Sequence, residues 1–393
     1  MISISLVTKE QSEQVHRLRD YCFSSNYQGE KREDFQYWIE HSTTIGAFDD
    51  YTEKLVGQLL ILPLNMTIHN QNYKMGGIGF VATYPEYRNR GIMKKLMEKA
   101  LEEMRRNQQA ISVLAPFSVS FYRQFGWELF CDTVHYSISI YNCPLFGKKL
   151  DIIHRFSFRY LDEKSFDDIR YFHNEQMLIG TGGVQRDMAW WNRIKRREPD
   201  SHFAAVYEGN KVSGYIRYVI QDLTFHIKDF ITQNNNSDQA IWRFIAAHSA
   251  SINKIVGITA NHSYFDFSFH DPQIKKELTS DVMMRIVDVE KFLKDYNWKK
   301  LNDSLYIEIE DPIAPWNEKV LHINLVGEVC HCETHVSKDK ILALPINIFS
   351  ALMVGYLPLS ECLNYSKHKI DSTTIENWQD ALQTSRALFN EYF

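Results

Sequence analysis

The sequence has little cysteine and no excess of positive charge. Its 393 residues include six cysteines, too few for a disulfide scaffold, which favours a reducing, cytoplasmic environment. Its 44 Lys and Arg residues are outnumbered by 49 Asp and Glu residues, giving a formal net charge of −5. A broad basic surface for nucleic acid is therefore not expected.

Long apolar runs are also missing. The first residues, MISISLVTKEQSEQ, contain no basic segment followed by an apolar one, so no secretory signal peptide is expected. The longest apolar stretch, 341–360, is interrupted by Asn347, two prolines and Gly355. This interruption argues against a membrane-spanning helix. We therefore expect an ordinary globular protein that has no membrane partner.

The pattern of apolar residues predicts an α/β chain and changes twice along its length. We read three domains, at residues 1–150, 151–284 and 285–393. The second repeats the order of elements of the first, and the third ends in a helix over 373–390 that carries the chain to Phe393. Elements of the first domain are expected over these ranges: 11–23 (helix), 55–68 (two strands with a turn at Pro63), 74–83 (strand), 91–106 (amphipathic helix), 110–115 (strand), 118–125 (short helix) and 134–141 (edge strand).

The stretch that carries chemistry runs from Gly77 to Trp127. A strand leads into Arg88-Asn89-Arg90-Gly91-Ile92-Met93 and then into the amphipathic helix. Gly91 lets a ligand approach the backbone, and the first-turn N–H groups and the helix dipole favour an anion such as a pyrophosphate. On this spacing alone, an ordinary strand–turn–helix with a basic surface stays open as the alternative.

A second feature lies just downstream of that helix. The strand over 111–115 ends at Pro116, and a short helix then carries Tyr122. A phenol is thereby expected just beyond the strand end. Taken alone, Tyr122 is better explained as a packing aromatic residue with a satisfied hydroxyl.

Together these motifs resemble those of the GNAT acetyltransferase superfamily. Residues 88–93 are similar to its Arg/Gln-x-x-Gly-x-Gly/Ala coenzyme A loop and depart from it at Met93. Tyr122, followed by Phe125-Gly126-Trp127, is similar to its Tyr-x-x-x-Gly-Phe motif. The resemblance is closest to the Eis (enhanced intracellular survival) acetyltransferases and extends over nearly the whole chain, through these segments: Arg186–Arg193 with Trp190-Trp191, Ile241–His248, Met284–Asp288 and the final Phe393.

The resemblance implies two tandem GNAT-like domains, the second without the coenzyme A loop, followed by a sterol-carrier-like domain. It implies acetyl transfer from acetyl-CoA to a primary amine of an aminoglycoside, a polyamine or a lysine side chain, in a homohexamer. Tyr122 would be the general acid and the Phe393 carboxylate the general base. The implied coenzyme A contacts are Val81, Ala82, Thr83, Arg88, Asn89, Arg90, Gly91, Ile92, Met93, Lys94, Phe117 and Ser118.

These implied roles suit the chemistry of amine acetylation. An amine attacks only when it is neutral, so a base must take a proton. A free α-carboxylate, with a pKa of about 3.3–3.7, is ionised at pH 7. A tyrosine can donate to the departing thiolate. The alternative is a catalytically degenerate protein that binds acyl-CoA or a hydrophobic ligand, and Met93 is the residue that favours it.

The segment Cys330-His331-Cys332-Glu333-Thr334-His335 has the composition of a metal site. It lies in an expected strand over 329–336, where successive side chains point to opposite faces. The cysteines and the histidines therefore cannot converge on one ion. We expect core-facing cysteines, surface histidines and no metal site.

Overall fold

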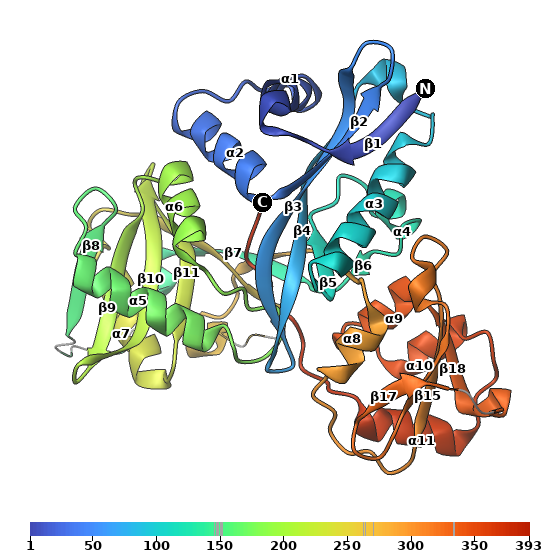
Figure 1. Ribbon diagram of the computed structural model, residues 1–393. Coiled ribbons are helices and arrows are strands. Elements are labelled where there is room, and N and C mark those ends of the chain that lie inside the picture. The colour runs from blue at the N-terminus through green and yellow to red at the C-terminus, as the bar shows by residue number, and fades with distance from the viewer. Residues whose placement is uncertain are drawn as a thin grey trace. The chain divides into compact units, whose positions relative to one another are not determined.

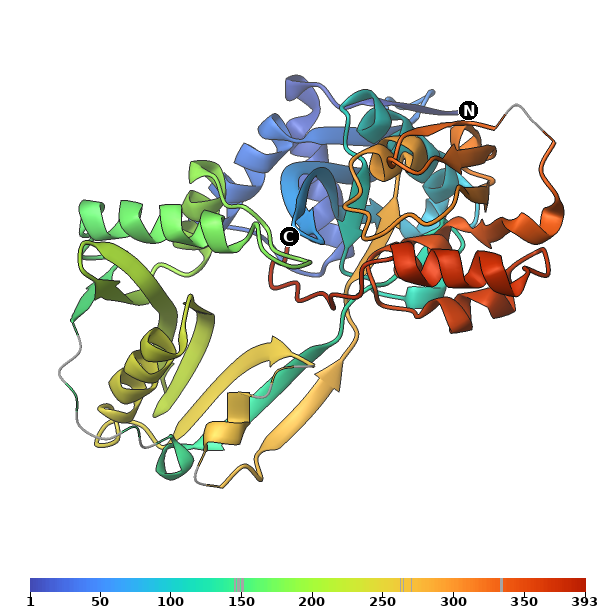
Figure 2. The same ribbon diagram turned by 90° about the horizontal axis from the view of Figure 1, so that it is seen from below.

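The computed structural model describes residues 1–393 apart from 145, 147, 148, 150, 151, 262, 264, 270, 333 and 334. The chain is mixed α/β and forms two compact units (Figures 1 and 2). The first unit comprises residues 1–131, 180–182 and 281–393. The second unit comprises residues 132–179 and 183–280.

A seven-stranded sheet organises the N-terminal part of the first unit. Its strand order is β1 (Ile2–Leu6), β2 (Thr43–Asp49), β3 (Lys54–Ile68), β4 (Gln71–Thr83), β5 (Ile111–Leu114), β14 (Met283–Ile286) and β6 (Glu128–Leu129). Helices α1 (Ser12–Cys22) and α2 (Glu30–His41) cover one face, and α3 (Ile92–Arg106) and α4 (Val119–Arg123) cover the other (Figure 1).

Helix α3 forms because its apolar residues recur every three or four positions. Leu96, Met97, Ala100, Leu101 and Met104 are all fully buried and pack in one core with β2 and β3. The amphipathic helix expected over 91–106 is thereby confirmed. Its burial fixes the direction in which the helix N-terminus points, which matters for the site described below.

Strand β3 is continuous, so the turn expected at Pro63 is wrong. Pro63 is exposed and pairs with Gly76 of β4. Strand β2 pairs with β3 only as far as Ile61. A proline is tolerated here because β3 has a single partner strand beyond Ile61, so the missing N–H is not needed for a second ladder.

A second seven-stranded sheet forms the centre of the second unit. Its order is β13 (Lys275–Thr279), β7 (Thr133–Ser139), β12 (Lys254–Ala260), β11 (Thr224–Thr232), β10 (Lys211–Gln221), β9 (His202–Glu208) and β8 (Ile153–Ser157). The helices of this unit are α5 (Glu163–Gln176), α6 (Met188–Arg197) and α7 (Asn235–Ala246).

The strand pairings divide the chain at different places from the boundaries expected at 150 and 284. Strand β7, expected at the edge of the first domain, lies inside the second sheet between β13 and β12. Strand β14 lies in the first sheet between β5 and β6. Residues 150 and 151, where the first boundary was expected, lie outside the described residues.

The C-terminal part of the first unit has its own four-stranded sheet. The order is β17 (Val329–His331), β16 (Val320–Ile323), β15 (Leu305–Glu310) and β18 (Ile341–Pro345). Its helices are α8 (Val289–Lys294), α9 (Ile346–Met353), α10 (Leu359–Cys362) and α11 (Ser372–Ala381). No helix in the described part of the chain is both long and apolar enough to traverse a bilayer.

The C-terminal helix is shorter than expected. It ends at Ala381 rather than at Asn390, and Asp371 rather than Ser372 caps its start by accepting a hydrogen bond from the Thr374 N–H at 2.7 Å. The following segment, 382–393, has no regular secondary structure. Its buried residues Ala387, Phe389 and Glu391 alternate with more exposed ones, which is the periodicity of an extended chain and not of a helix.

The cysteine and histidine segment differs from the expectation in the exposure of Cys330 and in the length of its strand. Cys330 is exposed, with Sγ 3.6 Å from Nδ1 of His322 on the paired strand. Strand β17 ends at His331, and Glu333 and Thr334 lie outside the described residues. Among the described residues, no group of three or more His, Cys, Asp or Glu side chains is placed to hold a metal.

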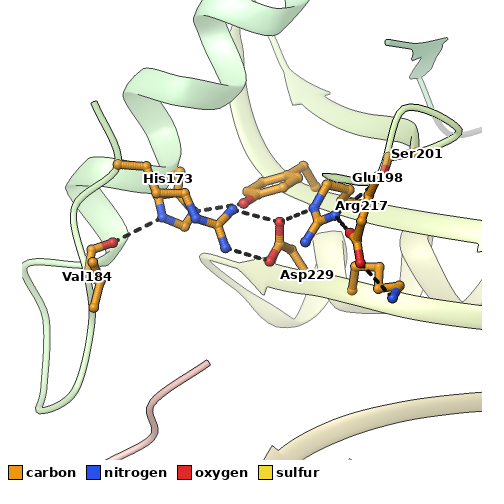
Figure 3. A network of polar contacts seen from close by, with 9 residues as sticks. His173, Val184, Glu198, Ser201, Arg217 and Asp229 are labelled. Carbon is orange, nitrogen blue, oxygen red and sulfur yellow. Dashed lines mark hydrogen bonds and ion pairs between the residues drawn. The ribbon is translucent and has the colours of Figure 1, made fainter. Parts of the chain in front are cut away.

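A buried charge network holds the second unit together (Figure 3). Asp229 is 3% exposed and accepts two hydrogen bonds from Arg186, at 2.8 and 2.9 Å, and one from Arg217 at 2.8 Å. Arg217 also contacts Glu198, which accepts a hydrogen bond from Lys228 at 2.8 Å. Burial alone would raise the pKa of Asp229, but the two arginines outweigh it and hold the pKa well below its usual range.

We expect Asp229→Asn to destabilise the protein by about 3–5 kcal/mol, because it removes the carboxylate that the buried Arg186 and Arg217 share and leaves Arg217 with Glu198. Urea denaturation measures this change. The matched control is Asp200→Asn, which breaks an exposed pair with Arg159 at 2.6 Å and should cost less than about 1 kcal/mol. Equal effects of the two substitutions would contradict the assignment.

The network also predicts a pH dependence. The folded-state pKa of Asp229 lies below that of an unfolded aspartate, about 3.9, so its stabilising contribution is complete at neutral pH. The contribution is lost as pH falls through the folded-state pKa.

Candidate active site

The central feature of the first sheet is the place where the parallel strands β4 and β5 stop pairing, which we call the opening. The two strands pair only at Met75–Ile111, Gly76–Ser112 and Gly77–Val113. Beyond these pairs, β4 bulges: Gly79 pairs with Leu60 and Ala82 with Gln58, so that two residues of β4 face one of β3. Backbone groups of β4 beyond the bulge are therefore turned toward the opening, where an extended ligand can pair with them.

The bulge depends on Phe80, a residue that the sequence analysis did not single out. Its φ angle is +55°, a conformation that non-glycine residues rarely adopt. Its ring packs on Phe35 of α2 at 4.5 Å between ring centroids. The glycines at 76, 77 and 79 were the available signal, because glycine inside a strand indicates a bulge or a close approach.

At the far end of β4 the chain turns into the exposed start of α3. Gly91 has φ 71° and ψ 8°, and Asn89 also has a positive φ of 61°. No side chain caps this helix among the described residues, so its first-turn N–H groups face outward. A Cβ atom placed on Gly91 would meet no described atom within 4 Å. These features match the anion site expected from the sequence.

The side chains around this helix start add positive charge. Arg88, Arg90 and Lys94 are exposed. Arg88 is held toward β4 by a hydrogen bond from Nε to the Thr83 carbonyl oxygen at 3.3 Å, and Arg90 lies over the Tyr87 ring at 5.1 Å. The basic side chains therefore flank the N-terminus of α3 without blocking it.

The remaining residues expected to contact coenzyme A separate into two groups. Ile92 is buried in the core and Met93 packs against it, so only their backbone groups face the helix start. The side chain of Met93, which stands where the expected motif has a small residue, is partly buried against this core. The others lie on β4 beyond the bulge or before α4: Val81, Ala82, Thr83, Phe117 and Ser118.

Tyr122 lies on α4, which Ser118 caps by accepting a hydrogen bond from the Phe121 N–H at 3.3 Å. The Tyr122 ring is 3% exposed and packs edge-on against Phe121 and Phe117. Burial raises the pKa of Tyr122 to about 12. No hydrogen bond to its hydroxyl is present among the contacts of the described residues, and its role as general acid stays a prediction.

Phe393 reaches the opening from the other end of the chain. A Cβ atom placed on Gly77 would lie 2.8 Å from Cε2 of the Phe393 ring, and one placed on Gly79 would lie 3.5 Å from its carbonyl carbon. Figure 1 shows this end of the chain beside β3 and β4. The ring therefore packs over a glycine, and the terminal main-chain group lies beside the bulge of β4.

The second unit repeats part of this architecture, but the start of its helix differs. Strands β11 and β12 are parallel, and β11 bulges at Lys228, as β4 does at Phe80. Helix α7 follows, but its N-terminus is capped because the Asn234 side chain accepts a hydrogen bond from the Ser237 N–H at 3.0 Å. A capped helix start has fewer free N–H groups for a phosphate. Burial also raises the pKa of Asp238, in the first turn of this helix, to about 6.

Three family models together span most of the chain. Models of an acetyltransferase (GNAT) domain match residues 3–130 and 182–286. A model of a sterol carrier protein domain matches residues 289–390.

The chain is also similar to other proteins over most or all of its length. An uncharacterized N-acetyltransferase of Streptomyces coelicolor is 19% identical over 344 residues, which cover 82% of this chain and 81% of the relative. The crystal structure of a probable N-acyltransferase from Enterococcus faecalis V583 matches with a TM-score of 0.90 at 27% identity, covering 100% of both chains. Eis1 from Mycobacterium abscessus matches with a TM-score of 0.81 at 15% identity, again covering 100% of both chains, and so shares the fold.

The chain therefore consists of two GNAT domains followed by a sterol carrier protein domain, as expected. It belongs to the GNAT acetyltransferases and has the fold of Eis1. The expected enzyme class, an acyltransferase, is confirmed at this level.

Proposed function

We propose that the protein transfers an acetyl group from acetyl-CoA to a primary amine of a cationic acceptor. The observation that carries this proposal is the bulged opening of β4, which leads directly to the uncapped, basic start of α3. The pantetheine arm would pair with the backbone of Val81–Thr83. The pyrophosphate would accept hydrogen bonds from the N–H groups that follow Gly91.

The acceptor chemistry follows from the groups at the other end of the opening. The Phe393 carboxylate attracts an ammonium group and takes its proton, so that the neutral nitrogen attacks the acetyl carbonyl carbon. The bond from that carbon to sulfur then breaks, and the Tyr122 O–H group stabilises the departing thiolate. An aminoglycoside, a polyamine and a lysine side chain all supply such an amine.

The substitution Gly91→Asp should abolish acetyl-CoA binding and with it acetyl transfer. An aspartate there places a carboxylate against the pyrophosphate, whereas a Cβ atom at this residue meets nothing in the described protein. The loss would therefore not come from a clash within the fold. Isothermal calorimetry with acetyl-CoA, together with a colourimetric free-thiol assay over a panel of amines, measures both effects.

Gly91→Asn is the matched control for this experiment. It has nearly the shape of aspartate, tolerates a positive φ and carries no charge. The difference between the two variants isolates the effect of charge. Unchanged affinity in Gly91→Asp would overturn the proposed site. If none of the amines in the panel causes the wild-type chain to release thiol, the result would instead support the alternative, a binding protein without turnover. The homohexamer and the cytoplasmic location stay predictions.

A further inference from the structure

A closed ring of hydrogen bonds fastens the C-terminal segment 382–393 to the first sheet. Ser385 Oγ lies 2.5 Å from Nδ1 of His69 and 2.8 Å from Oγ1 of Thr181. Thr181 Oγ1 in turn accepts a hydrogen bond from the His69 backbone N–H at 3.0 Å. His69 follows β3, Thr181 lies in the segment 180–182, and Ser385 lies in the C-terminal segment. We call these three residues the tail latch.

The contacts of His69 fix its tautomer. Its Nε2 faces the Met353 carbonyl oxygen at 2.9 Å and must donate to it. His69 is 1% exposed, and burial lowers its pKa to about 4, so the ring is neutral at pH 7. Nδ1 is therefore an acceptor, and it lies 2.5 Å from Ser385 Oγ and 3.2 Å from Thr181 Oγ1. Both hydroxyl groups can donate to it, and they also hydrogen-bond to each other.

Backbone hydrogen bonds join the segment 180–182, which we call the clamp, to the C-terminal segment and to β3. The Leu388 N–H donates to the Thr181 carbonyl oxygen at 3.1 Å, and the Gly182 N–H donates to Thr67 of β3 at 2.8 Å. A Cβ atom on Gly182 would lie 2.2 Å from the Leu388 carbonyl oxygen. Only glycine fits there, so the tail and the clamp are in direct contact.

Beyond the latch, the chain runs to the active-site opening with little freedom. Phe389 is 1% exposed, and its ring packs on Phe130 at 5.7 Å and on Phe393 at 6.4 Å between ring centroids. The Tyr392 hydroxyl donates to Asp281 at 3.1 Å. A shift of the chain at Ser385 would therefore be transmitted to the terminal carboxyl group beside Gly79.

We propose that Thr181 and Ser385 are positioning residues that hold the Phe393 carboxylate at the active-site opening. This inference rests on the proposed function, because it assumes that the carboxylate acts as the base. Under this inference, two residues outside the acetyl-CoA site affect catalysis. They are 204 residues apart in the chain.

The test compares Thr181→Val, Thr181→Ser and Ser385→Ala. Thr181→Val keeps the shape and removes the hydroxyl, and Thr181→Ser restores the hydroxyl. We expect kcat to fall about tenfold or more in Thr181→Val and Ser385→Ala, since small misplacements of a reacting group are costly, and to recover in Thr181→Ser. The affinity for acetyl-CoA should not change in any variant.

A second readout reports on the tail without relying on catalysis. Carboxypeptidase A added to the folded full-length protein should release Phe393 faster from Thr181→Val and Ser385→Ala than from the wild type. The control is Asn302→Ala, which removes an exposed hydrogen bond to Asp380 of α11 at 2.7 Å without touching the latch. Asn302→Ala should match the wild type in both measurements.

The outcomes separate the latch from the proposed base. Unchanged release of Phe393 in both latch variants would overturn the inference. Faster release with unchanged kcat would overturn the positioning role if deletion of Phe393 abolishes activity. If deleting Phe393 also leaves the activity unchanged, the result would instead show that the Phe393 carboxylate is not the base.

Discussion

Deleting Phe393 is expected to abolish acetyl transfer while leaving acetyl-CoA binding intact. The deletion moves the terminal carboxylate back by one residue, roughly 3.5 Å along the chain, and removes the ring that packs over Gly77. Loss of a general base typically lowers kcat by about 10²–10⁴-fold. Free-thiol release measures kcat, and calorimetry with acetyl-CoA shows whether the proposed acetyl-CoA site still binds its ligand.

Three further changes test whether the position of the Phe393 carboxylate matters for activity. Phe393→Ala keeps a carboxylate without its anchor, so a partial loss is expected. Gly77→Ala places a methyl group 2.8 Å from the Phe393 ring and should resemble Phe393→Ala although the C-terminus is unaltered. A C-terminal His-tag converts the carboxylate into an amide and should inactivate, whereas an N-terminal tag should not.

One result would rule out this base. A C-terminally tagged enzyme with normal kcat/KM would exclude the Phe393 carboxylate. The base would then have to be sought among the Asp and Glu side chains near the opening.

The parts of the site that depend on local sequence could be predicted. Gly91 at the helix start, the apolar face of α3 and the cap of α4 each depend on residues within one or two turns of one another. Backbone conformation and helix periodicity are local properties. A single sequence therefore contains the information needed to identify them.

The parts that depend on distant pairing could not be predicted in the same way. Strand β14 enters the first sheet beside β5, more than 150 residues earlier in the chain. The extended run after Ala381 has helix-forming residues, but its contacts with the segment 180–182 outweigh that propensity. The tail latch likewise joins three residues whose sequence neighbourhoods carry no common motif.

The buried environment of Tyr122 determines how it can act. With a pKa of about 12, the phenol keeps its proton across the pH range in which enzymes are assayed. Complete transfer of the phenol proton to a thiolate, whose conjugate thiol has a pKa of about 8.5, is unfavourable in water. If the sulfur of bound coenzyme A is shielded from water in the opening, its thiol pKa would be raised and the pKa difference between donor and acceptor would be smaller. Tyr122 is therefore expected to act first as a hydrogen-bond donor to the forming thiolate.

Tyr122→Phe should lower kcat by about 10²–10⁴-fold, with little change in the KM for acetyl-CoA. The ring still packs on Phe117 and Phe121. No described partner loses a hydrogen bond, so the fold and the binding site should survive. Single-turnover kinetics under saturating acetyl-CoA measures the effect on the chemical step and excludes a change in product release.

The matched control for this experiment is Phe121→Leu, which alters the packing around Tyr122 but keeps the hydroxyl, and it should retain most of kcat. The pH profile gives an independent check. Because burial raises the pKa of Tyr122 to about 12, its deprotonation should produce no fall in wild-type kcat between pH 7 and about 10. A value of kcat within a few-fold of wild type in Tyr122→Phe, with chemistry rate-limiting, would make Tyr122 a packing residue and require another donor for the thiolate.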